Sequence, residues 1–277
     1  MLAHARSIHS QIGLLVEEMQ LEIGPRRQGL QLFLQRLSLR SDLNGEEREA
    51  LLALPGQPQR VEAHRDIVGL GDDVDHACLV LDGLVGRFAQ LSDGRRQTIG
   101  LHSPGDMADL YSLMMPKAPS ALHALTKATV LRIPHAALRK LTARYPAVGA
   151  AFWRDCVVDG NVMGQWLLNV GRREARGRLA HLICELAVRI SRSERPSERS
   201  YPIRITQEQL ADALGLTSVH VNRTLKALRE EGLASLAKGQ VHIEDWDALA
   251  AAAEFDPSYL GLPESRVATP ALSVQGS

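Results

Sequence analysis

The chain has 277 residues, of which 45% are hydrophobic and 23% are charged, and its formal net charge is zero. These values are typical of a globular protein, and the length is sufficient for two domains with separate cores. Because the net charge is zero, a nucleic-acid-binding surface must be a local patch of cations. The chain lacks an apolar run of about 18 residues and the N-terminal pattern of a signal peptide, so we predict a cytoplasmic protein with no membrane partner.

The three cysteines, Cys78, Cys156 and Cys184, are far apart in the chain. No two of them have the spacing of zinc or iron–sulfur ligands, so the sequence predicts no metal site. An odd number of scattered cysteines also argues against a disulfide framework. The sequence identifies no cofactor and no catalytic residues, and we predict that the protein is not an enzyme.

Residues 1–28 are predicted to form an N-terminal extension with an amphipathic helix, because apolar residues recur at helical spacing over residues 8–23. The apolar stripe of this helix needs a partner surface, in the same chain or in a second subunit. Two further helical patterns follow, at residues 30–39 and 45–54.

From about residue 61 to residue 134 the pattern changes to short apolar runs separated by Gly, Asp and Pro. Such runs, at intervals of roughly ten residues with Asp-Gly turns between them, indicate an antiparallel sandwich, barrel or jelly roll, and the spacing does not choose among these. We assign residues 29–135 to this domain. The predicted strands cover residues 67–70, 77–81, 85–91, 98–101, 121–125 and 129–133.

Residues 136–170 again carry apolar side chains at three- and four-residue spacing. A helix of this length between two domains is too apolar to stand alone in water, so we predict that two subunits pair along it. The alternative is a core helix that packs within one subunit. A polar, Pro-containing loop is then predicted at residues 191–202.

Residues 206–229 have the pattern of a helix-turn-helix. Thr206 and Gln209 form a capping-box pair at the start of a helix that stops at Gly215. In such a motif a small residue allows the two helices to cross closely, glycine takes the left-handed turn conformation, and a β-branched residue fills the space between the helices. Ala211, Gly215 and Val221 have the required spacing.

The second helix of this motif is predicted to begin after a capping Thr217 and to run to about residue 231. No acidic residue occurs from Thr217 to Arg229, a stretch with three cations. Arg223 has the geometry to donate two hydrogen bonds to guanine, Asn222 can reach adenine or a phosphate, and Lys226 and Arg229 suit phosphates. The alternative is an ordinary helical hairpin with a solvated basic face.

Two short strands follow, at residues 234–237 and 240–243, with Lys238 in the turn between them. A β-hairpin directly after a recognition helix is a wing, and its tip lies near the DNA backbone. We therefore assign residues 171–254 to a winged helix-turn-helix domain and residues 255–277 to a tail predicted to be disordered. The predicted DNA-contacting residues are Thr217, Ser218, Val219, His220, Asn222, Arg223, Lys226, Arg229 and Lys238.

Over residues 30–254 the chain resembles the Crp–Fnr superfamily, named for the cyclic-AMP receptor protein and the fumarate–nitrate reduction regulator. The resemblance rests on the turns Gly71-Asp72, Gly83, Asp93-Gly94 and Pro104-Gly105-Asp106, and on the stretch from Leu216 to Leu225. It implies an α+β fold with an antiparallel β-roll (jelly-roll) sensor domain, a long dimerisation helix and a winged helix-turn-helix. It further implies a homodimer that binds an inverted repeat of double-stranded DNA, with RNA polymerase as a partner if the protein is an activator. In the family, the positions of Ser218, Val219, Asn222 and Arg223 meet base edges.

The effector is where the chain departs from the family. Members that bind cyclic nucleotides carry a Gly-Glu pair and, about ten residues later, an Arg that neutralises the phosphate. Here Asp109-Leu110 stands at the first position and residues 117–120 at the second, so we predict an effector other than cyclic AMP. The candidate pocket residues are Gly105, Asp106, Asp109, Lys117 and Ser120.

Two alternatives remain for the β domain. It is a purely structural platform if the regulator works without a ligand. It is a catalytic jelly roll if it binds a metal, but this requires a His-x-His pair, and His76 has no histidine two residues away. The oxygen-sensing branch of the family needs a cysteine cluster that is absent here, and a haem site would depend on the scattered His64, His76, His102 or Cys78.

Overall fold

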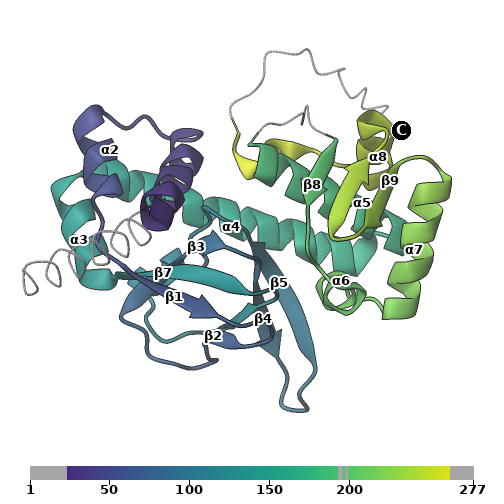
Figure 1. The fold of residues 1–277 in the computed structure, drawn as a ribbon, viewed down its shortest axis with the longest axis horizontal. Helices are drawn as coiled ribbons and strands as arrows, with labels where there is room; N and C mark the ends of the chain where they lie inside the picture. Colours follow the sequence, from purple (N-terminus) through teal and green to yellow (C-terminus); the bar gives the residue numbers. More distant parts are fainter. Residues whose placement is uncertain (1–23, 193–195, 197–198, 263–277) are drawn as a thin grey trace, which may run out of the picture.

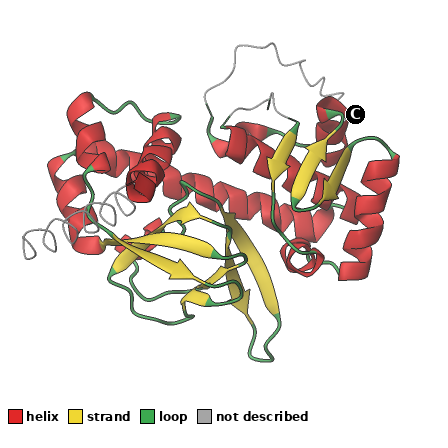
Figure 2. Cartoon of the chain, viewed as in Figure 1, coloured by secondary structure: helices red, strands yellow, loops and turns green. Residues whose placement is uncertain are grey.

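The computed structural model describes residues 24–192, 196 and 199–262. Three groups of elements follow the chain: helices at the N-terminal side, a β-roll beneath them, and a long helix that leads to a second α/β unit (Figures 1 and 2). The predicted fold class, with an antiparallel β-roll and a winged helix-turn-helix, is confirmed. In the described part of the chain no helix is long and apolar enough to cross a membrane.

The β-roll consists of two facing antiparallel sheets, with strand orders β1-β7-β3 and β2-β6-β4-β5. The predicted runs all fall on strands, whereas β1 was not predicted because its sequence QPQRV is mostly polar. The elements are β1 Gln57–Val61, β2 Asp66–Val68, β3 His76–Asp82, β4 Val85–Gln90, β5 Arg96–His102, the 3-10 helix η1 Leu110–Leu113, β6 Ala121–Ala124 and β7 Ala128–Pro134.

The predicted Asp-Gly turns are present, with φ of +85° at Gly83 and +87° at Gly94. Positive φ is strained for residues that carry a Cβ atom. At Gly83 a Cβ would also lie 2.4 Å from the carbonyl oxygen of Lys127, so space as well as conformation requires glycine there. This turn joins β3 to β4 and so connects the two sheets of the roll.

The predicted single helix over residues 136–170 is wrong in one respect, because the chain forms two helices there. These are α3 His135–Arg144 and α4 Pro146–Arg172, separated by Tyr145 with φ −127° and ψ 86°. A residue before proline avoids the helical region, and proline itself suits the first position of a new helix. The apolar spacing continues across this break, which is why the periodicity did not reveal it.

Helices pack on the outside of the β1-β7-β3 sheet. A helix over residues 24–38 and α2 Gly45–Leu52 share one buried cluster with β3, β7, α3 and the first half of α4. The helices predicted at residues 30–39 and 45–54 are therefore confirmed. The pattern at residues 8–23 lies outside the described residues.

Beyond α4 the chain forms the winged unit, whose core is continuous with the second half of α4 through Val158, Val162 and Trp166. The elements are α5 Ala175–Ser191, β8 Ser200–Pro202, α6 Gln207–Leu214, α7 Ser218–Glu230, β9 Ala234–Ala237, β10 Gln240–Ile243, α8 Trp246–Ala253 and the 3-10 helix η2 Pro257–Leu260.

The prediction of a disordered tail from residue 255 is wrong for its first part. Residues 257–260 form η2, and Leu260 is only 1% exposed. The Tyr259 hydroxyl donates to Glu185 at 3.0 Å, and Arg40 Nε donates to the Leu260 carbonyl at 2.7 Å. These contacts fasten the segment between the N-terminal region and α5. Residues 263–277 lie outside the described part.

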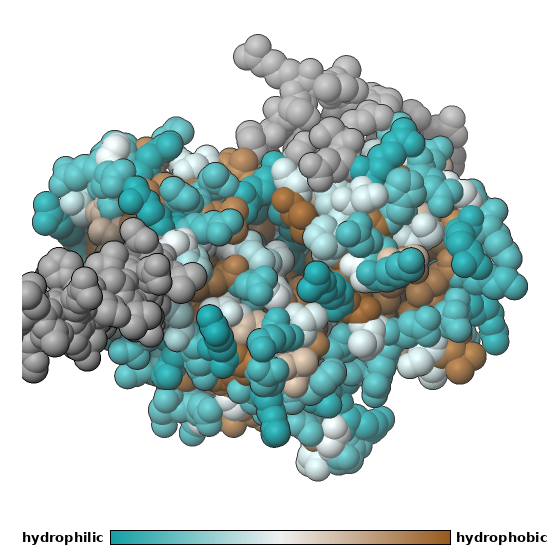
Figure 3. Space-filling model, viewed as in Figure 1, coloured by the Kyte–Doolittle hydropathy of each residue, from teal (hydrophilic) through white to brown (hydrophobic). Residues whose placement is uncertain are grey.

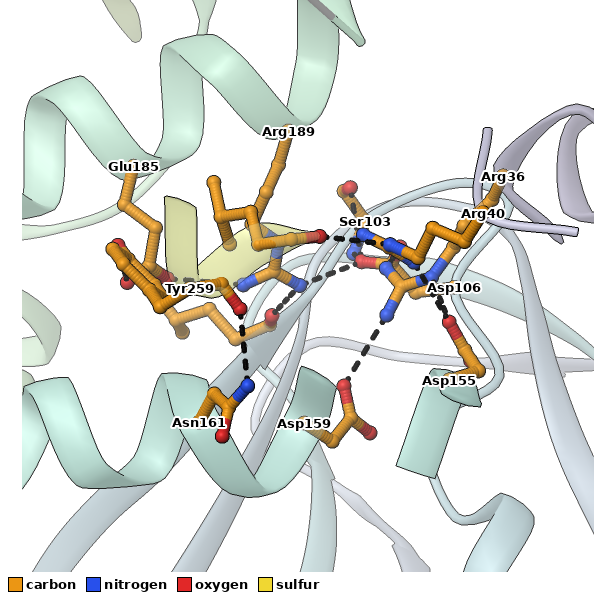
Figure 4. Close-up of polar contacts among 12 residues, drawn as sticks. Arg36, Arg40, Ser103, Asp106, Asp155, Asp159, Asn161, Glu185, Arg189 and Tyr259 are labelled. Atoms are coloured by element: carbon orange, nitrogen blue, oxygen red, sulfur yellow. Dashed lines mark hydrogen bonds and ion pairs between the residues drawn. The ribbon is translucent and has the colours of Figure 1, made fainter. Parts of the chain in front are cut away.

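A buried ionic cluster joins the sensor and winged units (Figure 4). Asp106, in the loop after β5, accepts from Arg36 of the N-terminal helix and from Arg189 of α5, the latter at 2.9 Å. Arg36 also contacts Asp155 at 2.7 Å and Asp159 at 3.2 Å, both on α4. The Arg36 guanidinium and the Asp106 carboxylate thus connect the N-terminal helix, the loop after β5, α4 and α5.

The charges in this cluster depend on each other. Burial opposes ionisation of Asp106, but the charges of Arg36 and Arg189 outweigh burial and hold the pKa of Asp106 well below its usual range. For Asp159 burial prevails over the attraction of Arg36 and raises its pKa. A group with a depressed pKa, such as Asp106, stabilises the fold above its unfolded pKa and loses that contribution as the pH falls.

We predict that Arg36→Met lowers the free energy of unfolding by about 3–5 kcal/mol, because it removes a cation from the buried carboxylates of Asp106 and Asp155. Urea unfolding measures this loss. The control is Arg95→Met, which removes an exposed ion pair with Asp93 and should change stability little. Equal stability of the two variants would show that the buried cluster does not hold the units together.

Candidate nucleic-acid interface

The helix-turn-helix begins with the capping box predicted from the sequence. The Thr206 hydroxyl accepts from the Gln209 N–H at 3.1 Å, and the Gln209 side chain accepts from the Thr206 N–H at 2.9 Å. Thr217 caps α7 in a similar way, accepting from the His220 N–H at 3.3 Å. Each cap satisfies a backbone donor at a helix N-terminus, so both helices start where the sequence places them.

The turn between the helices has the predicted scaffold. Gly215 ends α6 in the left-handed conformation, with φ 62° and ψ 41°. Ala211 and Val221 are 5% and 0% exposed, and the Leu216 N–H donates to the Ala211 carbonyl at 3.0 Å. The small, left-handed and β-branched residues thus occupy the roles that their spacing predicted.

Helix α7 buries one face and exposes the other. Val221 and Leu228 are fully buried, Thr224 lies with them, and Leu225 is half-buried. The surface over α7 is mainly hydrophilic in Figure 3. The predicted contact residues on this helix are all exposed: Ser218, Val219, His220, Asn222, Arg223, Lys226 and Arg229.

Two acidic residues at the end of α7, Glu230 and Glu231, form ion pairs with nearby basic residues. Lys226 Nζ lies 3.6 Å from Glu230, and both side chains are more than half exposed. An exposed pair of this kind contributes only about 0–1 kcal/mol, so Lys226 remains available to a phosphate. Glu231 instead pairs with Arg176 of α5. Arg223 has no ion pair among the described residues.

The wing is a three-stranded sheet with the order β8-β10-β9. Lys238 and Gly239 form its two-residue turn, with φ of +52° and +74°. Lys238 is exposed at the tip, as predicted. The third strand, β8, falls in the segment predicted to be a loop. Only three of its residues pair with β10, so it was not predicted as a strand.

Polar contacts that the sequence did not reveal fix the motif to the rest of the chain. Gln97 of β5 donates to the Asp212 carbonyl at 2.8 Å, and Gln209 donates to the Leu125 carbonyl at 2.8 Å. Arg178 of α5 donates to the Leu214 carbonyl at 3.0 Å, directly beside the turn. Side-chain-to-carbonyl bonds between distant segments leave no local pattern in a sequence.

A cleft of about 920 Å³ separates the β4–β5 hairpin from the start of α7. Arg95 and Arg96 line it on the hairpin side, and Thr217 and His220 line it on the α7 side. Two cations of the β-roll therefore lie near the end of the helix that carries the predicted base-contacting residues.

The five effector candidates are not gathered in one place. Asp106 belongs to the ionic cluster and Gly105 precedes it in the same loop, whereas Lys117 is exposed, in a β-bridge with Asp73. Asp109 and Ser120 are buried in the roll. Asp109 Oδ1 accepts from the Cys78 N–H at 2.6 Å, and burial raises the pKa of Asp109 to about 6.

Arg87 was missed by the sequence analysis. It lies on β4 between Val85 and Ala89, and its side chain is buried although the strand reads as a typical half-buried one. The signal was present, because residues two apart on a strand share a face and Val85 is a core residue.

Within the described residues, no group of three or more His, Cys, Asp or Glu side chains is placed to bind a metal ion.

Two domain families match the units described above. Residues 58–145 match the cyclic nucleotide-binding domain, and residues 177–252 match the Crp-like helix-turn-helix domain. The chain belongs to the Crp–Fnr superfamily. It is a transcription regulator of the Crp–Fnr type.

Known proteins resemble this regulator over most of its length. The transcriptional activator protein FnrL of Cereibacter sphaeroides is 27% identical over 209 residues, which cover 73% of this chain and 82% of that protein. The fumarate and nitrate reduction regulatory protein of Escherichia coli is 24% identical over 210 residues, covering 75% and 83%. The structure of FixK2 from Bradyrhizobium japonicum has a TM-score of 0.61 at 21% identity and covers 72% of this chain and 97% of that one. FixK2 thus supports the fold of the regulator.

We predict that Gly215→Ala destabilises the regulator by about 1–2 kcal/mol, because the new methyl group must adopt a left-handed conformation. It would also lie 3.4 Å from Val170. Gly149→Ala is the matched control, since Gly149 is inside α4 and its Cβ would make only ordinary contacts. Urea unfolding should show opposite signs for the two substitutions. A loss of similar size in both would mean that the turn conformation is not the cause.

Proposed function

We propose that the regulator binds a specific inverted-repeat operator as a homodimer, with one α7 helix in the major groove of each half-site. The observation that carries this proposal is the exposed face of α7, on which Asn222, Arg223 and Lys226 project beside the wing without an acidic residue before Glu230. The N-terminal residues of a recognition helix enter the groove first, so we expect base edges to be met by Ser218, Val219, Asn222 and Arg223. RNA polymerase is a further partner if the regulator activates transcription.

The exposed face of α4 supports the homodimer. Trp153, Val157 and Leu167 are 70%, 55% and 72% exposed, although large apolar side chains usually avoid water. Gly160 and Gly164 continue the same stripe at four- and three-residue spacing, and no other atom approaches within 4 Å of where their Cβ atoms would be. This spacing is the seam of a two-helix coiled coil, and the glycines allow a second helix to approach closely.

A second copy of α4 is the occupant that fits this stripe best. A parallel pair of identical seams is self-complementary, as a two-fold interface requires. The opposite face of the same helix, with Val158 and Val162, is already buried in the regulator's own core. Pairing along α4 is expected to place the two recognition helices about 34 Å apart, one turn of B-DNA.

We also propose that the β-roll binds a small-molecule effector other than cyclic AMP. The loop that holds the cyclic phosphate in family members provides no buried cation here, because Lys117 is exposed. The competing proposal is a β-roll without a ligand. It is disfavoured by the buried polar atoms without partners inside the roll, which include atoms of Arg87 and His102.

We predict that Arg223→Ala weakens operator binding by about 5- to 150-fold, or about 1–3 kcal/mol, and relaxes base preference at one position per half-site. The operator is first selected from a random duplex library, and binding is measured by fluorescence anisotropy. Lys140→Ala, at an exposed cation of α3, should leave binding unchanged. Unaltered discrimination between operator and random DNA in Arg223→Ala would remove Arg223 from the base contacts.

Lys226→Ala is expected to weaken operator and random DNA alike, because a phosphate contact is not specific for sequence. The slope of log affinity against log salt should become shallower by roughly one unit per lost contact. The measurement is a salt series on both duplexes. A loss restricted to the operator would instead assign Lys226 to a base.

Val157→Glu is predicted to shift the regulator from dimer to monomer, because a carboxylate would face its own copy in an apolar seam. Sedimentation velocity measures the change, and operator affinity should fall with it. Leu70→Glu is a matched control, since Leu70 is also 55% exposed but lies on the β-roll. If wild type is monomeric at the concentrations that saturate the operator, the homodimer proposal fails.

A further inference from the structure

The interior of the β-roll contains a buried cation for which the described residues provide no ion pair. Arg87 on β4 is only 5% exposed, and its Nε is buried without a hydrogen bond. A guanidinium stays charged at every physiological pH. Because buried charges in proteins are normally paired or bind a ligand, an arginine in this position needs an explanation.

The strand register places Arg87 on the inner wall of the roll. Val85, two residues earlier on β4, and Leu122, directly opposite on β6, both belong to the interior core cluster. On β5 the residue opposite Arg87 is Gly100. A Cβ on Gly100 would lie 3.4 Å from Arg87 Nη2, so the absence of a side chain there leaves room for the guanidinium.

His102 lies beside Arg87 on the same wall. It is opposite Val85 on the neighbouring strand, it is 2% exposed, and neither ring nitrogen has a hydrogen-bond partner. Burial, and after it the charge of Arg87, lowers the pKa of His102 well below its usual value. The ring is therefore neutral at pH 7 and has one N–H to donate.

An acidic group also faces this interior but does not pair with Arg87. Asp109 is buried, its Oδ1 is used by the Cys78 N–H, and its Oδ2 has no partner. The charge of Arg87 favours ionisation of Asp109, yet burial is the larger effect and the pKa is raised to about 6. No ion pair or hydrogen bond joins Asp109 to Arg87 among the described residues.

The 3-10 helix η1 lies beside the Arg87 guanidinium. Tyr111 is half-buried, and its ring centroid lies 5.5 Å from the Arg87 guanidinium carbon. The Tyr111 hydroxyl is 3.4 Å from Ser120 Oγ, the predicted pocket residue. An aromatic ring therefore lies next to the cation, and its hydroxyl group is near Ser120.

We propose that Arg87 anchors the oxyanion group, carboxylate or phosphoryl, of a small-molecule effector inside the β-roll, with His102 as a second donor. The planar fork of arginine matches two oxygens of such a group. This inference deepens the proposed function, because it specifies the chemistry of the effector. It places the anchoring cation on the wall of the roll, on strand β4, and not in the loop of residues 117–120.

The site also has an electrostatic connection to the ionic cluster. The charge of Arg87 favours ionisation of Asp159, whose pKa burial raises and which contacts Arg36 at 3.2 Å. An anion bound to Arg87 neutralises part of this influence.

The test measures thermal unfolding of the full chain at constant ionic strength in chloride, with inorganic phosphate or succinate added in separate titrations. Wild type should gain roughly 5–10 °C at about 100 times the dissociation constant of the anion that binds. Arg87→Met should unfold at a higher temperature than wild type in chloride alone, because it removes an unpaired buried charge, and should not respond to either anion. Arg60→Met, at an exposed arginine of β1, should respond as wild type does.

The two titrations separate the possible sources, since a response to phosphate alone or to succinate alone assigns the class of head group. The inference is overturned if neither anion stabilises wild type, or if Arg87→Met responds as wild type does. Should Arg87→Met not fold, Arg87→Lys replaces it, and a weaker response than wild type is expected because the fork is lost. Operator binding is measured separately, so a failure of the anion site leaves the DNA-binding proposal untouched and the reverse also holds.

Discussion

The Asp106 carboxylate lies between two guanidinium groups that come from distant parts of the chain. Arg36 is 70 residues before it and Arg189 is 83 residues after it. Apolar burial stabilises many relative orientations of two units, because it is not directional. A buried carboxylate between two cations permits far fewer relative orientations, since any displacement leaves a charge without its partner in a low-dielectric interior. The orientation of the winged unit on the β-roll is therefore specified by this cluster, and the surrounding apolar contacts supply the bulk of the free energy.

Helix α4 carries both this cluster and the proposed seam. Asp155 and Asp159 are four residues apart and lie on the side that faces Arg36, while Val157 and Gly160 lie on the exposed side. The diameter of a helix with its side chains is only about 10 Å. If two copies of α4 pair as proposed, their seam lies within one helix diameter of the ion pairs to Arg36.

The parts of the fold that were predicted from the sequence are those set by neighbours three to six residues apart. The caps at Thr206 and Thr217 and the left-handed Gly215 each depend on one local interaction, and the structure has all three. The ionic cluster could not be predicted, because its partners are separated by many tens of residues and no charge pattern marks them. The break at Tyr145 was readable from the proline that follows it, but the continuous apolar spacing concealed it. The C-terminal segment was misread for a related reason, since Leu260 is buried by residues that only the tertiary structure brings to it.

Arg87 lies on an element of the β-roll to which the family resemblance does not direct attention. The resemblance predicts a cation in the loop of residues 117–120, and Lys117 there is exposed. Strand alternation alone places Arg87 on the core side of β4, but it does not reveal that Gly100 stands opposite, which depends on register. The backbone of β4 is held by strand pairing on both sides, so the position of the Arg87 Cα atom is fixed before any ligand arrives. Such preorganisation reduces the entropy lost on binding. In the proposed site, a ligand must place its anionic group against β4, and a ligand whose anionic group lies only near the loop of residues 117–120 would not bind Arg87.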